Sequence, residues 1–245
     1  MKSQTGKNLL LKWIVERESK AEEIDRTTQK VVEPMKVFVA GEEIEAPLDV
    51  VARYVINHCK TAREYDLQAG LFPDISTDLI KATRVFSSRI SNEQGNWFVD
   101  QGLSAPWGSI AVEDELVSAD PSERDGLYDK GLELWNHFAI PAQNGVAQAK
   151  ISKVLHAMRP SFFPVLDSRL RVHYKQQAMV MAKQMNIERS IKYAYWVAIR
   201  RDLVDSQKAL EVVRSQLQSH ENELVREWAA HVSNLRLHDV LAWSK

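Results

Sequence analysis

The chain contains a single cysteine, Cys59, among its 245 residues. One thiol cannot form an internal disulfide, a four-cysteine zinc site or a cysteine-ligated iron–sulfur cluster, and this composition is typical of a reducing cytosol. No apolar run approaches the roughly 20 residues that span a bilayer. The short apolar segment near the start is soon interrupted by charge, unlike a secretory signal. We therefore expect a soluble, cytoplasmic protein with no membrane partner.

Several common catalytic motifs are also missing. The sequence has no Walker-type loop, no dinucleotide fingerprint after a strand, no HExxH and no GxSxG. Its seven histidines are scattered. His231 and His238 lie about two helical turns apart but lack nearby partners for a metal ion. We therefore expect neither a cofactor nor a metal site.

The charges are unevenly distributed although the formal net charge is only -1. Residues 150–201 contain eleven lysines and arginines against two acids, whereas residues 113–125 contain six acids and one arginine. Charged side chains often do no more than solvate a helix surface. Their clustering nevertheless favours a surface that faces a polyanion.

Hydrophobic periodicity predicts a mainly α protein of two interleaved lobes within a single unit, residues 1–245, with working lobe boundaries at 1–121 and 122–245. At most one small peripheral β-hairpin is expected, at residues 35–45. The expected helices are at 7–26, 47–65 with Cys59 on its apolar face, 76–88 with Asp74 or Ser76 as the cap, 122–138, between the Asn144-Gly145 turn and Pro160, 167–185 and 187–217, with one or two more in 220–243. Residues 91–108 contain three glycines and no sustained period, which is typical of a long ordered loop.

The rest of the chain is organised around residues 144–174. A tight Asn144-Gly145 turn precedes a helix that the spacing predicts to be amphipathic, with Lys150, Lys153 and His156 at the surface. The helix ends before Pro160, and an apolar loop containing Pro164 follows. Asp167 is then the expected N-cap of the next helix, with Arg169 and Arg171 directly after it.

This stretch resembles the helix-hairpin-helix DNA glycosylases, in particular the oxoguanine-glycosylase-like members. The similarity covers about forty residues: Gly145-Val146-Ala147 stands where that superfamily has a Gly-Val-Gly hairpin, and Pro164-Val165-Leu166-Asp167 stands where it has the catalytic aspartate. The second hairpin glycine is replaced by Ala147. The nucleophilic lysine of bifunctional members falls on Ala149, so the resemblance implies a monofunctional enzyme, unless a register shift brings Lys150 into a lyase role.

The resemblance implies that Asp167 is catalytic. An ionised carboxylate stabilises the positive charge that develops on the sugar when an N-glycosidic bond breaks, and it can orient the attacking water. The alternative is that Asp167 only caps its helix. Residues expected to contact DNA are Asn144, Gly145, Val146, Ala147, Gln148, Lys150, Lys153, Arg169 and Arg171.

An extruded base must be held between aromatic faces, and a wedge must fill the gap that it leaves. Candidates for this pocket or wedge are Ser88, Arg89, Asn92, Glu93, Trp97, Phe98 and Trp107. The alternative for the three aromatic residues is that they anchor the loop to the core.

The implied partner is DNA, expected to be double-stranded and to contain a modified base. Within the superfamily, the chain is similar to bacterial anti-phage glycosylases that remove glucosylated hydroxymethylcytosine from phage DNA. Two other hypotheses remain open. One is a non-catalytic helix-hairpin-helix DNA-binding module, and the other is an interaction protein whose long C-terminal helices pack on a partner.

Overall fold

The structure is a computed structural model that describes residues 36–185 and 191–245. Lys36–Lys245 forms one compact unit, which is mainly α, as the periodicity predicted. The helix expected at residues 7–26 lies outside the described residues. The working boundary between lobes at residues 121 and 122 stays a prediction.

The one sheet of the described residues is the predicted hairpin. Strands β1 (Phe38–Val39) and β2 (Glu42–Glu43) pair antiparallel, with Phe38 opposite Glu43. The turn residues Ala40 and Gly41 both have positive φ, 53° and 74°. Two positive φ values are what a tight two-residue hairpin requires, because such a turn follows the twist of its strands.

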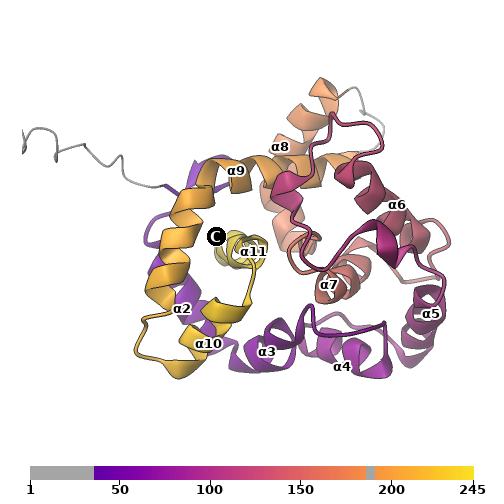
Figure 1. Cartoon of the computed structure of the whole chain (residues 1–245), viewed down its shortest axis with the longest axis horizontal. Helices are drawn as coiled ribbons and strands as arrows, with labels where there is room; N and C mark the ends of the chain where they lie inside the picture. Colours follow the sequence, from indigo (N-terminus) through magenta and orange to yellow (C-terminus); the bar gives the residue numbers. More distant parts are fainter. Residues whose placement is uncertain (1–35, 186–190) are drawn as a thin grey trace, which may run out of the picture. The chain divides into compact units, whose positions relative to one another are not determined.

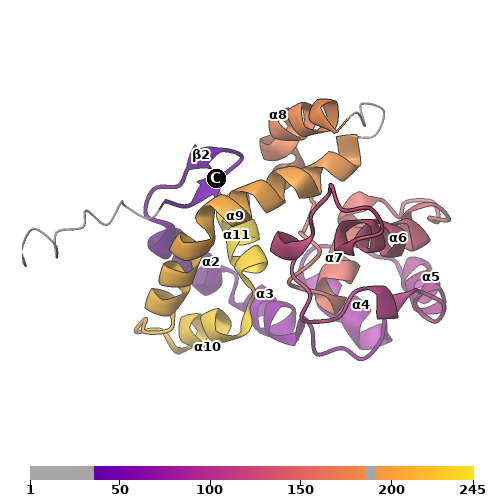
Figure 2. The same cartoon turned by 45° about the horizontal axis from the view of Figure 1, so that its top comes forward.

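The hairpin is not peripheral, contrary to the prediction. Val37 and Val39 are buried, and the Phe38 amide donates a 2.8 Å hydrogen bond to the Ser206 hydroxyl. β1 packs against α9 (Ile191–Leu217) and α11 (Asn234–Ser244). Figure 2 shows β2 beside the C-terminus, where Lys245 pairs with Glu42.

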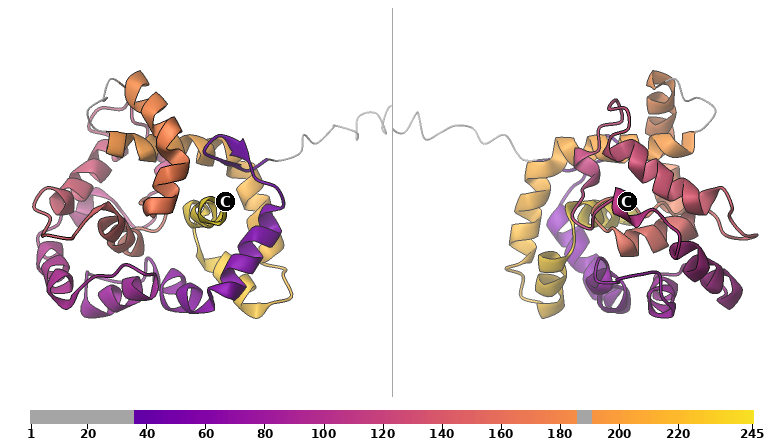
Figure 3. Two further views of the ribbon diagram at one scale, coloured as in Figure 1. Left: turned by 180° about the vertical axis from the view of Figure 1, so that it is seen from behind. Right: turned by 45° about the vertical axis from the view of Figure 1, so that its right-hand side comes forward.

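Helix α11 is the centre of one group of helices. It packs against α2 (Pro47–Asn57), α9 and α8 (Ser168–Gln184), and α10 (Glu223–His231) contacts both α2 and α9. Figure 1 shows α11 nearly end-on between these helices, and Figure 3 shows it from behind. All residues from Leu235 to Ala242 are buried. One or two helices were predicted in 220–243, and the structure has two, α10 and α11.

Helix α7 (Gln148–Met158) is the centre of a second group and contacts α4 (Thr77–Val85) and α6 (Leu127–Ala139). The helix predicted between the Asn144-Gly145 turn and Pro160 is confirmed as α7, but its predicted surface character is wrong. All of its residues from Ile151 onward are buried, including Lys153 and His156, so it is not an amphipathic surface helix. A helix that is apolar on most sides, and whose polar groups find partners, can be enclosed completely.

Residues 91–108 do not form the long loop that the glycines indicated. Asn92–Gly102 is helix α5, and Trp107–Ser109 is the short helix η2. The Ser91 hydroxyl accepts from the Gln94 amide, while the Gln94 side chain accepts from the Ser91 amide, each at 3.2 Å. This capping box satisfies two donors at the helix start, and it outweighs the low helix propensity of Gly95.

Other helix boundaries also differ from the expected ones. The helix expected at 47–65 breaks at His58 into α2 and α3 (Cys59–Glu64), and Cys59 is exposed, not on the apolar face. Of the two residues predicted as possible caps of α4, Ser76 is the cap. Helix α6 begins at Leu127, because the Asp120 carboxylate accepts from the amide and hydroxyl of Ser122 and holds a turn there.

Gly131 on α6 is required by packing. A Cβ atom at this position would lie 2.3 Å from Cε1 of Phe162, a fully buried ring in the loop that leads to Asp167. We expect Gly131→Ala to lower the free energy of unfolding by about 1–3 kcal/mol, because the buried ring cannot move freely. Urea denaturation measures this loss. An unchanged or higher stability would show that the ring has room to move.

Candidate functional site

The loop that leads to Asp167 is held by side chains from two helices. The Val165 amide donates to Oδ2 of Asp239 on α11 at 2.8 Å, and the Leu166 amide donates to Oγ of Ser152 on α7 at 3.1 Å. Both side chains belong to buried residues. Two consecutive amides with fixed partners leave the loop little freedom, so the position of Asp167 is determined by α7 and α11 together.

Asp167 caps helix α8, as predicted. Its Oδ1 atom accepts from the amides of Arg169 at 2.9 Å and Leu170 at 3.0 Å. No partner for Oδ2 is found among the described residues, and Asp167 is partly exposed. The cap therefore orients the carboxylate with one oxygen and leaves the other open to a ligand.

Lys153 is buried within electrostatic range of this carboxylate, which corrects its predicted surface position. Its ammonium donates to the Phe86 carbonyl at 2.7 Å and lies 4.6 Å from the centre of the Phe86 ring. Burial lowers the pKa of Lys153, and the charge on Asp167 opposes that shift. Lys153 therefore cannot bind a DNA phosphate directly, but it places a positive charge within electrostatic range of Asp167.

The segment after α4 has a strained backbone. Ser87 and Arg89 have positive φ, 56° and 51°, although neither is glycine. Such residues persist only where their surroundings hold them, and they cluster at functional sites. Ser88 between them is buried and donates to the Thr83 hydroxyl at 3.3 Å, which removes it as a wedge candidate. Arg89 is exposed, and its charge acts on Lys153.

A buried ion pair also packs against Phe86. Arg236 Nε donates to Asp66 Oδ1 at 2.9 Å, and the guanidinium lies 4.6 Å from the centre of the Phe86 ring. Tyr54 and Trp228 complete the group by hydrogen bonds of 2.9 Å to Arg236 and 2.8 Å to Asp66. Although burial by itself would lower the pKa of Arg236, Asp66 holds that pKa above its usual range.

The hairpin that the resemblance predicted at residues 144–147, directly before α7, is present, and a side chain of α5 holds it. Gly145 has φ +76°, and the Val146 amide closes the turn on the Gln143 carbonyl at 2.9 Å. The Gln94 side-chain amide donates to the Asn144 carbonyl at 3.0 Å, and Gln94 accepts from the Lys150 ammonium at 2.7 Å. Gln94 therefore connects the turn to the first turn of α7, a contact that the sequence did not reveal.

The remaining hairpin residues divide by burial. Val146 is buried and faces the core, and Gln148 is half-buried. Ala147 is exposed and caps α7 without a side-chain hydrogen bond, so the first amides of α7 receive no cap from that side chain. Unpaired amides at a helix start favour an anion.

The aromatic candidates gather in one cluster. Trp97, Phe98 and Trp107 all pack around Phe138 of α6, with ring centres 5.9 to 6.4 Å from it. Phe98 is fully buried, so it cannot hold an extruded base at the surface. Trp97 and Trp107 are partly buried, and their predicted role in a base pocket stays a prediction. The packing agrees with the alternative that these aromatic residues anchor their segment to the core.

The two polar pocket candidates lie at the start of α5. Asn92 accepts from Arg84 at 2.9 Å, and Glu93 accepts from Gln143 at 2.7 Å. Both are exposed. Glu93 therefore supports the turn before α7, whereas Asn92 connects the start of α5 to α4.

The basic surface is smaller than the sequence count indicated. Arg159 is buried and donates to the backbone carbonyls of Ile110, Met158 and Trp107. Arg169 and Arg171 are exposed at the start of α8, and Arg169 lies 4.6 Å from the Trp243 ring centre. Arg169 and Arg171 therefore face outward directly after Asp167, and Arg89 faces outward within electrostatic range of Lys153.

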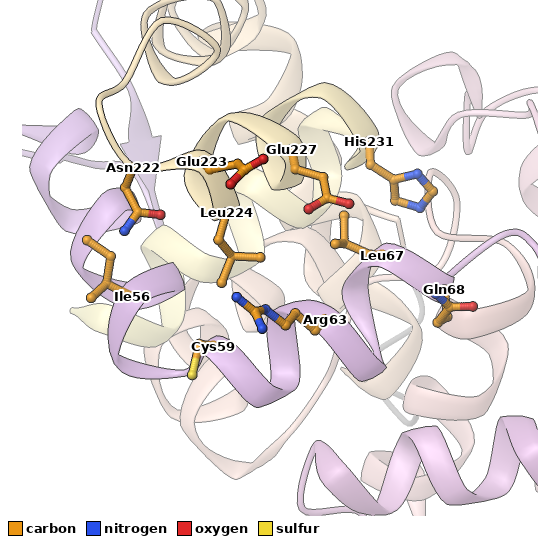
Figure 4. Close-up of a pocket in the computed structure, with 10 residues that line it drawn as sticks. All are labelled: Ile56, Cys59, Arg63, Leu67, Gln68, Asn222, Glu223, Leu224, Glu227 and His231. Carbon is orange, nitrogen blue, oxygen red and sulfur yellow. The ribbon is translucent and has the colours of Figure 1, made fainter.

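Asp167 lines none of the four best-defined pockets of the described residues. The largest, of about 750 Å³, lies between α2–α3 and α10. Figure 4 shows Arg63 and Leu67 on one side of it and Glu223, Glu227 and His231 on the other. Within residues 36–185 and 191–245, no three histidine, cysteine or acidic side chains gather as a metal site would require.

Asp239 has an unusual environment that predicts a pH effect on stability. Burial raises the pKa of Asp239 to about 7. Between pH about 4 and about 7 the folded chain thus keeps a proton that the unfolded chain has lost, and the free energy of unfolding falls as the pH rises.

We expect Asp239→Asn to remove this pH dependence. Relative to the wild type, the free energy of unfolding of the variant should rise by about 1.4 kcal/mol per pH unit between pH about 4 and about 7. Urea denaturation of both proteins across this range measures the difference. Burial lowers the pKa of His156 to about 3. His156 titrates equally in both proteins, so its contribution cancels in the difference between them. A difference that does not vary with pH would contradict the account.

The described residues thus define a helical protein with an oriented, partly exposed carboxylate at the start of a long helix. By comparison with known families, the chain belongs to DUF6308, a family of unknown function whose model matches residues 100–245. That range includes the hairpin, Asp167 and Asp239, but not Arg89. No curated protein matches the chain, and no solved structure does. No helix among the described residues is long and apolar enough to cross a membrane.

Proposed function

We propose that this chain is a monofunctional DNA glycosylase in which Asp167 is the catalytic carboxylate. The observation that carries the proposal is the order turn, α7, buried loop and capping aspartate, with the loop held at two consecutive amides. This order is the one that the resemblance to helix-hairpin-helix glycosylases implied. A carboxylate aimed by a rigid loop can serve a reaction in which positive charge develops on a sugar.

The electrostatic surroundings suit an ionised carboxylate. Lys153, within electrostatic range, carries a positive charge, and the helix dipole of α8 favours a negative one at its start. Ionised Asp167 would stabilise the oxocarbenium-like state and orient the water that attacks C1′. The reaction would release a base and leave an abasic site.

The hairpin supplies a place for the DNA backbone. Gly145 and the first amides of α7 form a turn followed by a helix start, which can hold one phosphate oxygen. Arg169 and Arg171 lie exposed at the start of α8 and can pair with flanking phosphates. The proposed DNA contacts are thus made by the hairpin and these arginines, with Lys153 serving Asp167 instead.

A lyase activity through Lys150 is not proposed. Its ammonium is held by Gln94 at 2.7 Å beside the hairpin, and Ala149 stands at the position of the family's nucleophile. The proposed substrate is double-stranded DNA with a modified base, and glucosylated hydroxymethylcytosine of phage DNA is the first to test. That choice, and with it a role in anti-phage defence inside the bacterial cytoplasm, rests on the resemblance alone.

The test is to incubate the purified full chain with genomic DNA from unmodified and from base-modified phages. The DNA is then heated in alkali, which breaks strands at abasic sites, and the released base is identified by mass spectrometry. The proposal expects alkali-dependent breaks and a free base from one modified DNA only. Strand breaks without alkali would indicate a lyase instead.

The alternative is a non-catalytic DNA-binding module. It is favoured by one observation, that Asp167 lines none of the four best-defined pockets. It expects binding that weakens steeply with salt and no base release from any DNA. The same incubations, with a parallel salt titration of DNA binding, decide between the two.

A further inference from the structure

The loop before Asp167 depends on two polar side chains that lie in the core. Ser152 accepts from the Leu166 amide and also donates to the Ala149 carbonyl at 3.2 Å, so its hydroxyl is fixed in both roles. Asp239 accepts from the Val165 amide with Oδ2, while its buried Oδ1 has no partner among the described residues. A buried carboxyl group that forms a hydrogen bond through only one of its two oxygens is unusual if its role is purely structural.

We propose that Ser152 and Asp239 are positioning residues for Asp167 and that the charge on Asp239 modulates the reaction there. This inference rests on the proposed function. Neither residue needs to touch the substrate, since each acts on Asp167 through the amide that it holds, one or two residues before it.

The charges around Asp239 come from three elements. Arg236 lies one turn earlier on α11, Asp66 comes from the short helix η1 (Asp66–Gln68), and Asp167 stands before α8. The hydroxyls of Tyr54, Tyr65 and Tyr174 are also within electrostatic range, and burial raises the pKa of each. They are therefore neutral where Asp239 titrates, so Arg236 and the two other acids are the charges that act on it.

Asp239 changes its charge in the neutral range, because burial raises its pKa to about 7. When it ionises, the hydrogen bond from Val165 becomes charge-assisted and stronger. A second negative charge also appears near Asp167, where positive charge develops on the sugar. Base release should therefore become faster as the pH rises through about 7.

The two positioning residues can be separated by their variants. Asp239→Asn keeps an acceptor for Val165 but cannot ionise, so single-turnover base release should lose its rise near pH 7. Ser152→Ala removes one hydrogen bond without changing any charge, so it should lower the rate about tenfold at every pH and keep the rise. The inference is wrong if Asp239→Asn keeps the wild-type pH profile or if Ser152→Ala releases base at the wild-type rate.

A second measurement does not depend on activity. The amide proton of Val165, followed by NMR, should shift with a midpoint near pH 7 in the wild type and in Ser152→Ala, but not in Asp239→Asn. An amide that does not titrate in the wild type overturns the inference. The wild type could release no base from any DNA while this amide titrates as expected. In that case the proposed function is wrong, but the titration of Asp239 and its hydrogen bond to Val165 are supported.

Discussion

Replacing Asp167 by asparagine should lower base release from modified DNA by about 100- to 1,000-fold, the usual effect of removing one electrostatic stabiliser of a transition state. Asparagine caps a helix as well as aspartate does, so the amides of Arg169 and Leu170 keep their acceptor and α8 keeps its start. DNA affinity should stay the same or rise slightly, because a negative charge is lost. Single-turnover base release and equilibrium binding are measured on the same duplex.

The matched control is Asp78→Asn. Asp78 is an exposed acid in the first turn of α4, where it pairs with Lys81, so this change removes the same charge from the start of another helix. Base release by this variant should equal that of the wild type. Retained activity in Asp167→Asn would limit Asp167 to capping its helix.

The second large effect concerns the buried ion pair. Arg236→Met leaves Asp66 as a buried carboxylate without its cation, and we expect the free energy of unfolding to fall by about 3–5 kcal/mol. The exposed pair of Arg201 and Asp205, with nitrogen and oxygen 3.8 Å apart, provides the control. Arg201→Met should change stability by no more than about 1 kcal/mol, the upper end of what surface pairs contribute. Urea denaturation measures both variants.

Additivity supplies the check on this interpretation. If the loss in Arg236→Met comes from the unpaired Asp66 carboxylate, a second change, Asp66→Asn, should restore part of it, because the uncompensated charge is gone. A double variant that loses the sum of the two single losses would show that packing of Arg236 on Phe86, not pairing with Asp66, dominates.

The central stretch could be predicted from the sequence because its signals are local. A glycine turn, a helical spacing of apolar residues, two prolines and a capping aspartate predicted α7 between Gly145 and Pro160 and the cap of α8. The same local reasoning predicted the β1–β2 hairpin and named Ser76 as one of two possible caps of α4. Each of these depends on a few neighbouring residues, and the structure confirms each of them.

The surroundings of the site could not be predicted, because they depend on contacts far apart in the chain. Lys153 looked like a surface lysine, yet its ammonium finds the carbonyl of Phe86, 67 residues away. Asp239 holds an amide 74 residues before it. A charged residue is expected to be exposed unless a partner is available, and periodicity carries no information about distant partners.

Helix α5 was missed for a different reason. Its signal was present in the sequence as Ser91 followed by Gln94 three residues later, the pattern of a capping box. Three glycines and three aromatic residues in residues 91–108 favoured a loop instead. The capping box would also have pointed to Gln94, the residue that holds the hairpin at residues 144–147.

The most direct test of the central claim needs no knowledge of the base. A duplex with a pyrrolidine in place of one nucleotide carries a positive charge where the sugar becomes positive, and a duplex with a tetrahydrofuran at that position has the same shape without the charge. We predict that the wild type binds the charged duplex at least about tenfold more tightly, as enzymes bind mimics of their transition states, and that Asp167→Asn loses this preference. Equal preference in the wild type and in Asp167→Asn would contradict a catalytic role for Asp167.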